Sequence, residues 1–371
     1  MASEAERLPE SDREGDLLHP RETAALVGHD EAERVLAESW STQRVPHAWL
    51  IGGPKGVGKA TLAYRFARVV LAGRPIDPQA EHPLAVLADD PVFRYVAAGT
   101  HPDLLVLRRP FDEKAKRFKS QLPVDEVRRI YPFFGRRAGE GGFRVCIVDA
   151  ADDLNANAAN ALLKLLEEPP AKGMFLILAH APARLLATLR SRCRRLQLKP
   201  VDERLVSALL AREAPALSEA DRRALARLAE GCPGRALALA RGEGLALYRE
   251  VASLFARLPD VDAQALYELA ERLARPAEEQ AYERALSFLR GWLNRLACHA
   301  ALAPAAEVMA GEEKVLARLA APARLEGWAA LWETASALIG RADALSLDRK
   351  QIILSIVFAA ARTAQGAPAG L

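Results

Sequence analysis

The sequence predicts an α/β domain built on a parallel sheet, followed by a small helical domain and a longer all-helical domain. Between residues 48 and 198, short apolar runs alternate with amphipathic segments of helical spacing, an order typical of parallel strands covered by helices on both faces. Strand patterns stop after Leu198, and only helical spacing follows. Half of the residues are hydrophobic but only 6% are aromatic, which favours helices over an all-β sandwich.

The chain is long enough for more than one hydrophobic core, because its 371 residues exceed the size at which single cores stop growing. The first residues are charged and lack periodicity, which is typical of disorder. Changes of pattern then predict five segments. They are a disordered tail over 1–18, the α/β domain over 19–198, a small helical domain over 199–243, a longer helical domain over 244–363 and a flexible tail over 364–371.

The elements of the α/β domain follow from apolar spacing. Ala32, Val35, Leu36 and Trp40 recur at helical intervals, which predicts a helix over 30–43. The next apolar run is short and ends in glycines, so it predicts a buried strand over 48–51. The remaining predicted strands are 104–107, 144–148, 174–178 and 194–198, and the remaining predicted helices of this domain are 60–72, 124–134 and 157–168.

Charge and cysteine usage exclude several classes of protein. A formal net charge of +3 is too small for binding nucleic acid through a global field. DNA contact would therefore depend on local basic segments such as 114–119 or Arg136-Arg137, although such runs are usually solvated surface.

The four cysteines are scattered and form no CxxC pair, which predicts reduced thiols. No apolar run approaches the ~20 residues of a membrane helix, so we expect a cytoplasmic protein with no membrane partner.

A glycine-rich loop carries the clearest chemistry. Residues 53–59, Gly53-Pro54-Lys55-Gly56-Val57-Gly58-Lys59, follow a predicted strand and precede a predicted helix. This is the spacing of a P-loop, in which backbone N–H groups wrap phosphates and the lysine neutralises their charge. We therefore assign Gly53, Gly56, Gly58 and Lys59 to a nucleotide site.

That site lacks its expected metal ligand. The residue after Lys59 should be a serine or threonine that binds Mg²⁺, but it is Ala60. Thr61 stands one residue later, where the helix turns it roughly 100° away. It is the remaining candidate for the hydroxyl, and an ordinary first-turn threonine is the simpler interpretation.

The predicted strand 144–148 ends at Asp149, a position typical of the carboxylate beside a nucleotide in P-loop proteins. A glutamate that orients the attacking water is expected next, and the chain has Ala150 instead. Asp152 and Asp153 are possible substitutes, but they better fit the start of the following helix. The sequence therefore predicts a degenerate, vestigial nucleotide site.

Two further segments make a family resemblance specific. LLKLLEEPP, over 162–170, is followed by Ser191-Arg192-Cys193, and with the P-loop this resembles the clamp-loader branch of the AAA+ ATPases. Four accompanying segments resemble the δ′ subunits of that branch in particular. They are HPDLLVL over 101–107, SQLPVDEVR over 120–128, VDAADDLN over 148–155 and GCPGRAL over 231–237. The resemblance runs from about His19 to Leu245.

The resemblance implies roles that the residues alone do not. The region 199–243 would be a helical lid and 244–363 a collar domain through which subunits assemble. Arg192, which taken alone reads as a surface arginine, would be an arginine finger given in trans to ATP bound by a neighbouring subunit. Arg235 lies where related ATPases keep a second phosphate-sensing arginine, and a helix-start role is an equal alternative.

Cofactor expectations also follow. Many members of the family carry a four-cysteine zinc module, but residues 71–100 contain no cysteine, so we expect neither zinc nor any other metal. His82 and His101 lie nearby and fit loop or cap roles better than zinc ligation. No cofactor is required by the predicted function, and the retained Lys59 leaves weak ATP or ADP binding open.

The resemblance implies the function of a non-hydrolysing subunit within a DNA polymerase III holoenzyme. The implied partners are the clamp-loader ATPase (γ/τ) subunits and the δ subunit, with the sliding clamp and primer-template DNA reached through the complex. One alternative is an ATP-hydrolysing clamp-loader or other AAA+ motor subunit, which Ala60 and Ala150 oppose. Another is a stand-alone DNA-binding module, which the low net charge opposes.

Overall fold

The computed structural model describes residues 9–15, 17–114, 116–135, 142–301, 307–321, 325–341 and 347–367. It divides into two compact units, the first formed by 1–213 with 229–238 and the second by 214–228 with 239–371. The boundaries predicted near 198 and 243 stay predictions. Over the described ranges, no helix combines the length and the apolar character needed to span a bilayer.

The first unit is built on a five-stranded sheet in the order β2-β5-β6-β1-β7, with every pair parallel. β6 therefore lies between β1, which leads into the P-loop, and β5, which leads to Asp149. The strands are β1 (Ala48–Gly52), β2 (Leu104–Leu107), β5 (Arg144–Val148), β6 (Gly173–Ala179) and β7 (Arg194–Gln197).

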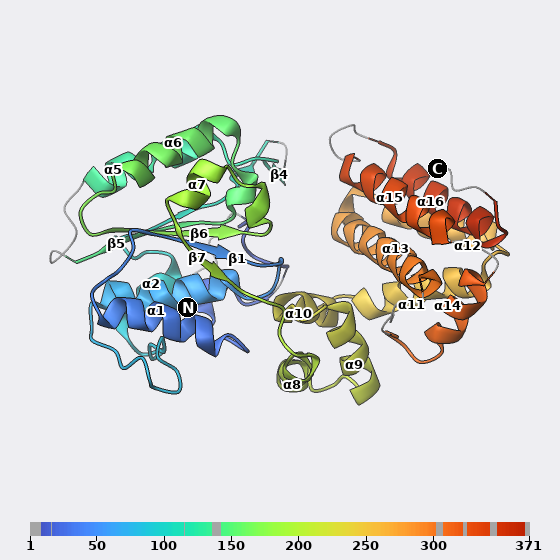
Figure 1. Cartoon of the computed structure of the whole chain (residues 1–371), viewed down its shortest axis with the longest axis horizontal. Helices are drawn as coiled ribbons and strands as arrows, with labels where there is room; N and C mark the ends of the chain where they lie inside the picture. Colours follow the sequence, from blue (N-terminus) through green and yellow to red (C-terminus); the bar gives the residue numbers. More distant parts are fainter. Residues whose placement is uncertain are drawn as a thin grey trace. The chain divides into compact units, whose positions relative to one another are not determined.

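Helices cover both faces of this sheet (Figure 1). One core lies between the sheet and α1 and α2, where Leu36, Phe66 and Ile147 are buried, and the other lies beneath α4 to α7, where Leu162 and Phe175 are buried. The predicted parallel α/β fold is confirmed. The helices of this unit are α1 (Asp30–Ser41), α2 (Lys59–Ala72), α3 (Pro91–Ala98), α4 (Val124–Arg128), α5 (Ile130–Gly135), α6 (Ala156–Glu167), α7 (Ala187–Ser191) and α8 (Glu203–Glu213), with 3₁₀ turns η1 (Pro20–Glu22), η3 (Ala151–Asp153) and η4 (Pro182–Arg184).

Two local expectations were wrong. The helix predicted over 124–134 is two helices, α4 and α5, that meet at Arg129. Pro132 explains the break, because proline has no N–H to donate to the carbonyl four residues earlier and fits only a first turn. A short antiparallel hairpin of β3 (Phe111–Asp112) and β4 (Arg117–Phe118) was also missed, because two-residue strands leave no periodic signal. Of the basic segment 114–119, Lys114 and Lys116 lie in the turn of this hairpin and Arg117 in β4, and Arg136-Arg137 lie outside the described residues.

The N-terminal expectation also needs correction. Part of the stretch expected to be a disordered tail lies against the α/β domain: the Asp12 side chain is 1% exposed and Leu17 is buried, whereas Leu18 is exposed. Glu10 and Asp12 pair with Arg108, which lies 98 and 96 residues further along the chain. Pairing over that distance leaves no trace in local composition.

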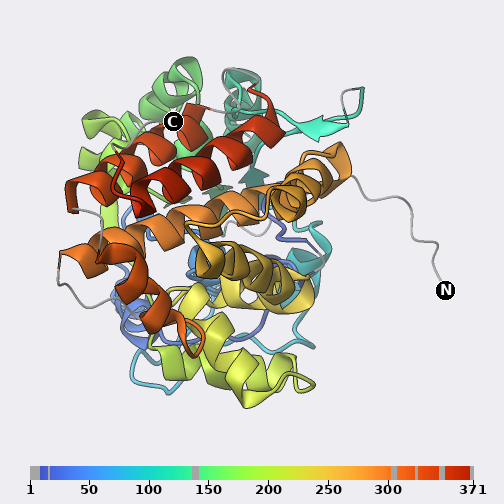
Figure 2. The same cartoon turned by 90° about the vertical axis from the view of Figure 1, so that its right-hand side faces the viewer.

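The regular elements of the second unit, over its described residues, are all helices, as the sequence predicts. Its longest helix, α13, packs on α11, α14, α15 and α16, and α12 packs on α16 (Figure 2). The helices are α9 (Glu219–Leu228), α11 (Gly244–Arg257), α12 (Ala263–Leu273), α13 (Glu279–Ala300), α14 (Glu312–Ala320), α15 (Leu325–Arg341) and α16 (Arg349–Ala364), with a 3₁₀ turn η5 (Pro276–Glu278); α10 (Pro233–Arg241) is shared between the two units.

A buried polar network joins three helices of this unit. The Glu312 carboxylate accepts hydrogen bonds from the Tyr248 hydroxyl at 2.6 Å, from the Arg295 guanidinium at 2.7 Å and from the Val308 N–H at 3.0 Å. Arg295 also donates to the Tyr248 oxygen at 2.8 Å. Each buried charge is thus paired, which is the condition under which ions are tolerated in a protein interior.

Candidate nucleotide site and exposed arginine

The P-loop has the backbone conformation that its glycines predict. β1 ends at Gly52 and α2 begins at Lys59. Gly56 and Gly58 have φ angles of 80° and 117°, a region that residues with a Cβ atom rarely adopt. The glycines are therefore required by the turn between strand and helix, whether or not phosphate binds there.

Lys59 folds back onto its own loop. Its side chain is nearly buried, and Nζ donates to the carbonyl oxygens of Gly53 at 2.7 Å and Pro54 at 2.9 Å. Burial lowers the pKa of Lys59 to about 8, although the carboxylates of Asp149 and Asp152 act to raise it. The ammonium thus has protein acceptors in place of phosphate oxygens.

The two alanines stand at the positions where the sequence predicts that catalytic groups are missing. Ala60 is the second residue of α2 and packs against the apolar core, and Ala150 is buried directly after Asp149. A methyl group at either position can neither bind a metal nor orient water. Thr61 follows Ala60 within α2, and its role as a substitute ligand stays a prediction.

Asp152 and Asp153, the two possible substitutes for the missing glutamate, are already engaged. The Asp152 carboxylate accepts from the backbone N–H groups of His180 at 2.6 Å and Ala181 at 2.8 Å, so it fixes the turn after β6. Asp153 pairs with Arg109 at 3.2 Å. Neither one starts the following helix, because α6 is capped by Asn155, whose side chain accepts from the Ala158 N–H.

Asp149 lies immediately after β5, as predicted. Burial, with the neighbouring Asp12 carboxylate, raises the pKa of Asp149 from 3.8 to about 7, although Lys59 acts to lower it. A raised carboxyl pKa means that the folded chain holds a proton that the unfolded chain releases, so the penalty for ionising Asp149 grows as pH rises from about 4 to 7.

We therefore expect Asp149→Asn to stabilise the first unit at pH 8 and to do so less at pH 5. The pKa difference corresponds to an upper limit of about 4 kcal/mol. Because Asp149 as a residue is only half-buried, solvent screening reduces the expected gain to about 2 kcal/mol. Thermal unfolding of the variant and of the wild type at both pH values measures this. The exposed Asp125→Asn serves as control, and a gain independent of pH would contradict the assignment of the raised pKa to Asp149.

Arg235 lies beside the P-loop. At the start of α10, the Gly234 N–H donates to the Gly56 carbonyl at 2.8 Å, and a Cβ atom on Gly56 would approach the Arg235 nitrogen to 2.8 Å. The Arg235 guanidinium lies 3.5 Å from Glu230. The structure thus brings Arg235 close to the P-loop residues Gly53, Gly56, Gly58 and Lys59. The role of Arg235 as a phosphate-sensing arginine stays a prediction.

Arg192 stands apart from that site. It follows α7 and is one-third exposed; its guanidinium donates to the Thr188 carbonyl at 2.9 Å and pairs with Glu167, the last residue of α6, at 2.6 Å. Over the residues that the structure describes, these contacts run to α6 and α7 and none reaches the P-loop. Arg192 is therefore held at the surface, where a second molecule can reach it.

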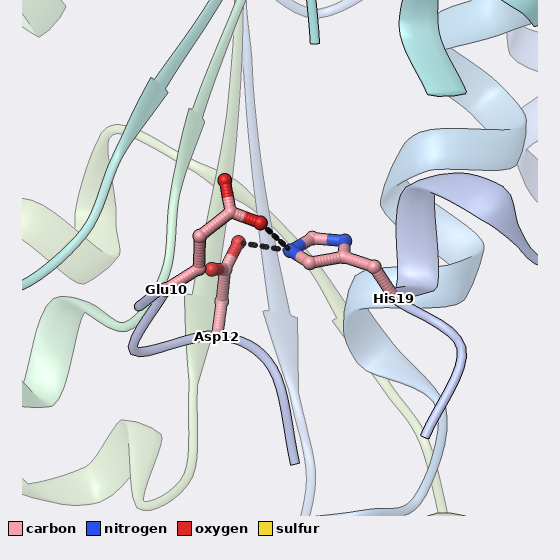
Figure 3. A group of neighbouring side chains, drawn as sticks. All are labelled: Glu10, Asp12 and His19. Atoms are coloured by element: carbon pink, nitrogen blue, oxygen red, sulfur yellow. Dashed lines mark ion pairs between the residues drawn. The ribbon is translucent and has the colours of Figure 1, made fainter. Parts of the chain in front are cut away.

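A cluster near the N-terminus was missed from the sequence. Glu10, Asp12 and His19 point their side chains toward one another (Figure 3), with His19 Nε2 3.2 Å from Asp12 Oδ2 and 3.5 Å from Glu10 Oε2. Arg108 pairs with both carboxylates, and Arg21 pairs with Glu10 at 2.8 Å. Burial acts to raise the pKa of Asp12, but His19 and Arg108 hold it below its usual value.

The cluster is better suited to holding chain segments together than to binding a cation. The ligand atoms of Glu10, Asp12 and His19 lie close enough together to hold a metal ion. However, the guanidinium groups of Arg21 and Arg108 already neutralise the carboxylates, and a cation would have to displace these guanidinium groups. In the described parts of the chain, no other His, Cys, Asp and Glu side chains gather in threes at ligand spacing.

The histidines considered for zinc have ordinary surroundings. His82 is exposed in the loop before α3, and His101 Nδ1 accepts from the Asp103 N–H at 3.2 Å, as a cap residue does. Cys146, Cys193 and Cys232 are buried free thiols, and Cys298 is half-buried. The absence of zinc stays a prediction.

The strand order, the glycine loop and the carboxylate after β5 define a P-loop nucleotide-binding domain. Residues 28–202 match the family model described as "DNA polymerase III, delta subunit". The chain is 39% identical over 208 residues to DNA polymerase III subunit delta' of Escherichia coli, covering 56% of this chain and 58% of that protein. The resemblance to δ′ subunits of DNA polymerase III that the motifs predict is confirmed.

Two other relatives agree. The delta' subunit of Pseudomonas aeruginosa is 41% identical over 147 residues, which are 40% of this chain and 41% of that protein. The Escherichia coli tau subunit is 30% identical over 258 residues, which are 67% of this chain and 38% of that protein. The similarity to the two delta' subunits thus spans roughly half of their lengths.

Proposed function

We propose that this chain is the δ′ subunit of a bacterial DNA polymerase III clamp loader, that it does not hydrolyse ATP, and that it supplies Arg192 in trans to ATP bound by a neighbouring subunit. The proposed direct partners are the τ or γ ATPase subunits and the δ subunit. The sliding clamp and primer-template DNA would be reached through the complex. Similarity to both delta' and tau subunits supports an assembly of related chains.

The observation that carries the proposal is the contrast between two sites on one chain. The nucleotide site keeps Lys59 and Asp149 but has the methyl groups of Ala60 and Ala150 where a metal ligand and a water-positioning group are expected. The Lys59 ammonium donates hydrogen bonds to carbonyl oxygens of the loop. Arg192, in contrast, is presented at the surface by α7. A guanidinium given in trans stabilises the charge that develops on the transferred phosphoryl group. The chain thus lacks the metal-binding hydroxyl and the water-positioning glutamate at its own site, and it presents an arginine for the site of a neighbour.

The experiment is steady-state ATP hydrolysis by the isolated chain, compared with its own Lys59→Ala variant. We expect the two rates to be equal and close to background, because the metal ligand and the water-positioning group are both missing. Adding the cognate ATPase subunits, δ and the clamp should then produce ATP hydrolysis stimulated by primer-template DNA. Hydrolysis by the isolated chain that Lys59→Ala abolishes would identify a motor subunit instead and overturn the proposal.

A further inference from the structure

The acidic N-terminal segment, residues 10–14, runs across the edge of the sheet where the nucleotide site lies. At one end, Asp12 pairs with Arg108, the residue that follows β2, at 3.0 Å. At the other end, Glu14 pairs with Lys55 of the P-loop at 3.0 Å. The segment therefore connects the carboxyl end of β2 to the loop that follows β1.

The strand order fixes what lies beneath this segment. β5 and β6 separate β2 from β1, so a stretch that reaches from the end of β2 to the P-loop passes the carboxyl ends of both. Asp149 follows β5. In P-loop proteins the metal ion and the terminal phosphates bind between that carboxylate and the loop lysine. Asp12 is also one of the charges that raise the pKa of Asp149, which agrees with their proximity.

The segment is anchored on several sides. Arg108 and Arg21 pair with Glu10, and Arg108 also pairs with Asp12. His19 contacts both carboxylates (Figure 3). The anchors near β2 are mostly buried, whereas the contact between Glu14 and Lys55 is exposed. The segment is thus fixed at the β2 end and held more loosely at the P-loop.

We propose that residues 10–14 act as an internal competitor of nucleotide polyphosphate. The segment lies between the end of β2 and the P-loop, where Asp12 is near Asp149 and Glu14 engages the P-loop lysine Lys55. Polyphosphate would bind the P-loop only when the segment is displaced, because Glu14 and the phosphates are both anions that the P-loop attracts. This inference concerns the chain's own site and does not depend on the role of Arg192.

The test is a fluorescence titration of the isolated full-length chain with the magnesium complex of N-methylanthraniloyl-ADP. We expect the double variant Asp12→Asn, Glu14→Gln to bind at least tenfold more tightly than the wild type. Adding Lys59→Ala to that variant should abolish the gain, since the gained affinity is for the P-loop. The control Asp77→Asn, Glu81→Gln removes the same two charges from an exposed loop and should bind as the wild type does.

The single variant Glu14→Gln provides a second test in case the loss of Asp12 impairs folding. Glu14 is exposed and its pair is with Lys55, so the single variant should fold normally and bind two- to threefold more tightly. Unchanged affinity in both variants, or a gain that survives Lys59→Ala, would overturn the inference. Failure of the Arg192 proposal would show instead in the reconstituted complex and would leave this titration unaffected.

Discussion

Arg192→Ala is expected to lower the turnover of ATP by a reconstituted clamp loader by about three powers of ten, the lower end of what arginine fingers contribute. The loss should fall on kcat with little change in KM, because the guanidinium acts on charge that develops in the transition state. It should leave assembly of the complex intact, since Arg192 is partly exposed and its contacts are a helix carbonyl and the Glu167 carboxylate.

The measurement is DNA-stimulated ATP hydrolysis by complexes that differ only in this chain. Arg184→Ala is the matched control, because Arg184 is an exposed arginine a few residues earlier and should have little effect. Arg192→Lys should recover only part of the rate, since lysine keeps the charge but loses the planar fork that matches phosphate oxygens. A complex with Arg192→Ala that assembles and hydrolyses ATP at the wild-type rate would refute the finger assignment.

Glu312→Ala is expected to destabilise the second unit by about 3–5 kcal/mol, the range found when one partner of a buried ion pair is removed. The substitution leaves Arg295 without its carboxylate and leaves the Val308 N–H without its acceptor. The adjacent Glu313 is exposed, so Glu313→Ala should change the stability by less than about 0.5 kcal/mol.

Urea unfolding followed by tryptophan fluorescence measures this difference, since Trp292 lies beside Arg295, whose guanidinium is 4.5 Å from the ring centroid. Adding Arg295→Ala to Glu312→Ala should cost less than the sum of the single losses, because the second change removes the unpaired charge. Additive losses, or a Glu312→Ala cost as small as that of Glu313→Ala, would show that the network does not stabilise the unit.

The parts of the site that the sequence predicted are those encoded over a few consecutive residues. The P-loop glycines and Lys59 form one contiguous motif, and Asp149 follows a strand whose apolar run is unmistakable. Arg192 was found through its short motif and the family resemblance, but its partner Glu167 was not. The pair joins the last residue of α6 to the residue after α7, so it depends on how the two helices pack, which periodicity within either helix does not determine.

The contacts that the sequence did not predict are those between distant segments. Asp12 and Arg108 are separated by 96 residues, and each taken alone is an ordinary charged residue. The acidic composition of the N-terminus predicted disorder, because composition does not show that Arg21 and Arg108 pair with those carboxylates. The same limit explains why Asp152 was assigned to a helix start. Its carboxylate oxygens accept from the backbone N–H groups of the turn after β6, which is far from Asp152 in the sequence.

The ion pair between Arg192 and Glu167 has a consequence for how the chain would meet a neighbour. A guanidinium that is already neutralised attracts an incoming phosphate less strongly than a bare one, so docking becomes an exchange of one anion for another. The net electrostatic gain is then the difference between two similar interactions. Contact through this face would therefore depend weakly on ionic strength, and complementary shape rather than attraction at a distance would select the neighbour.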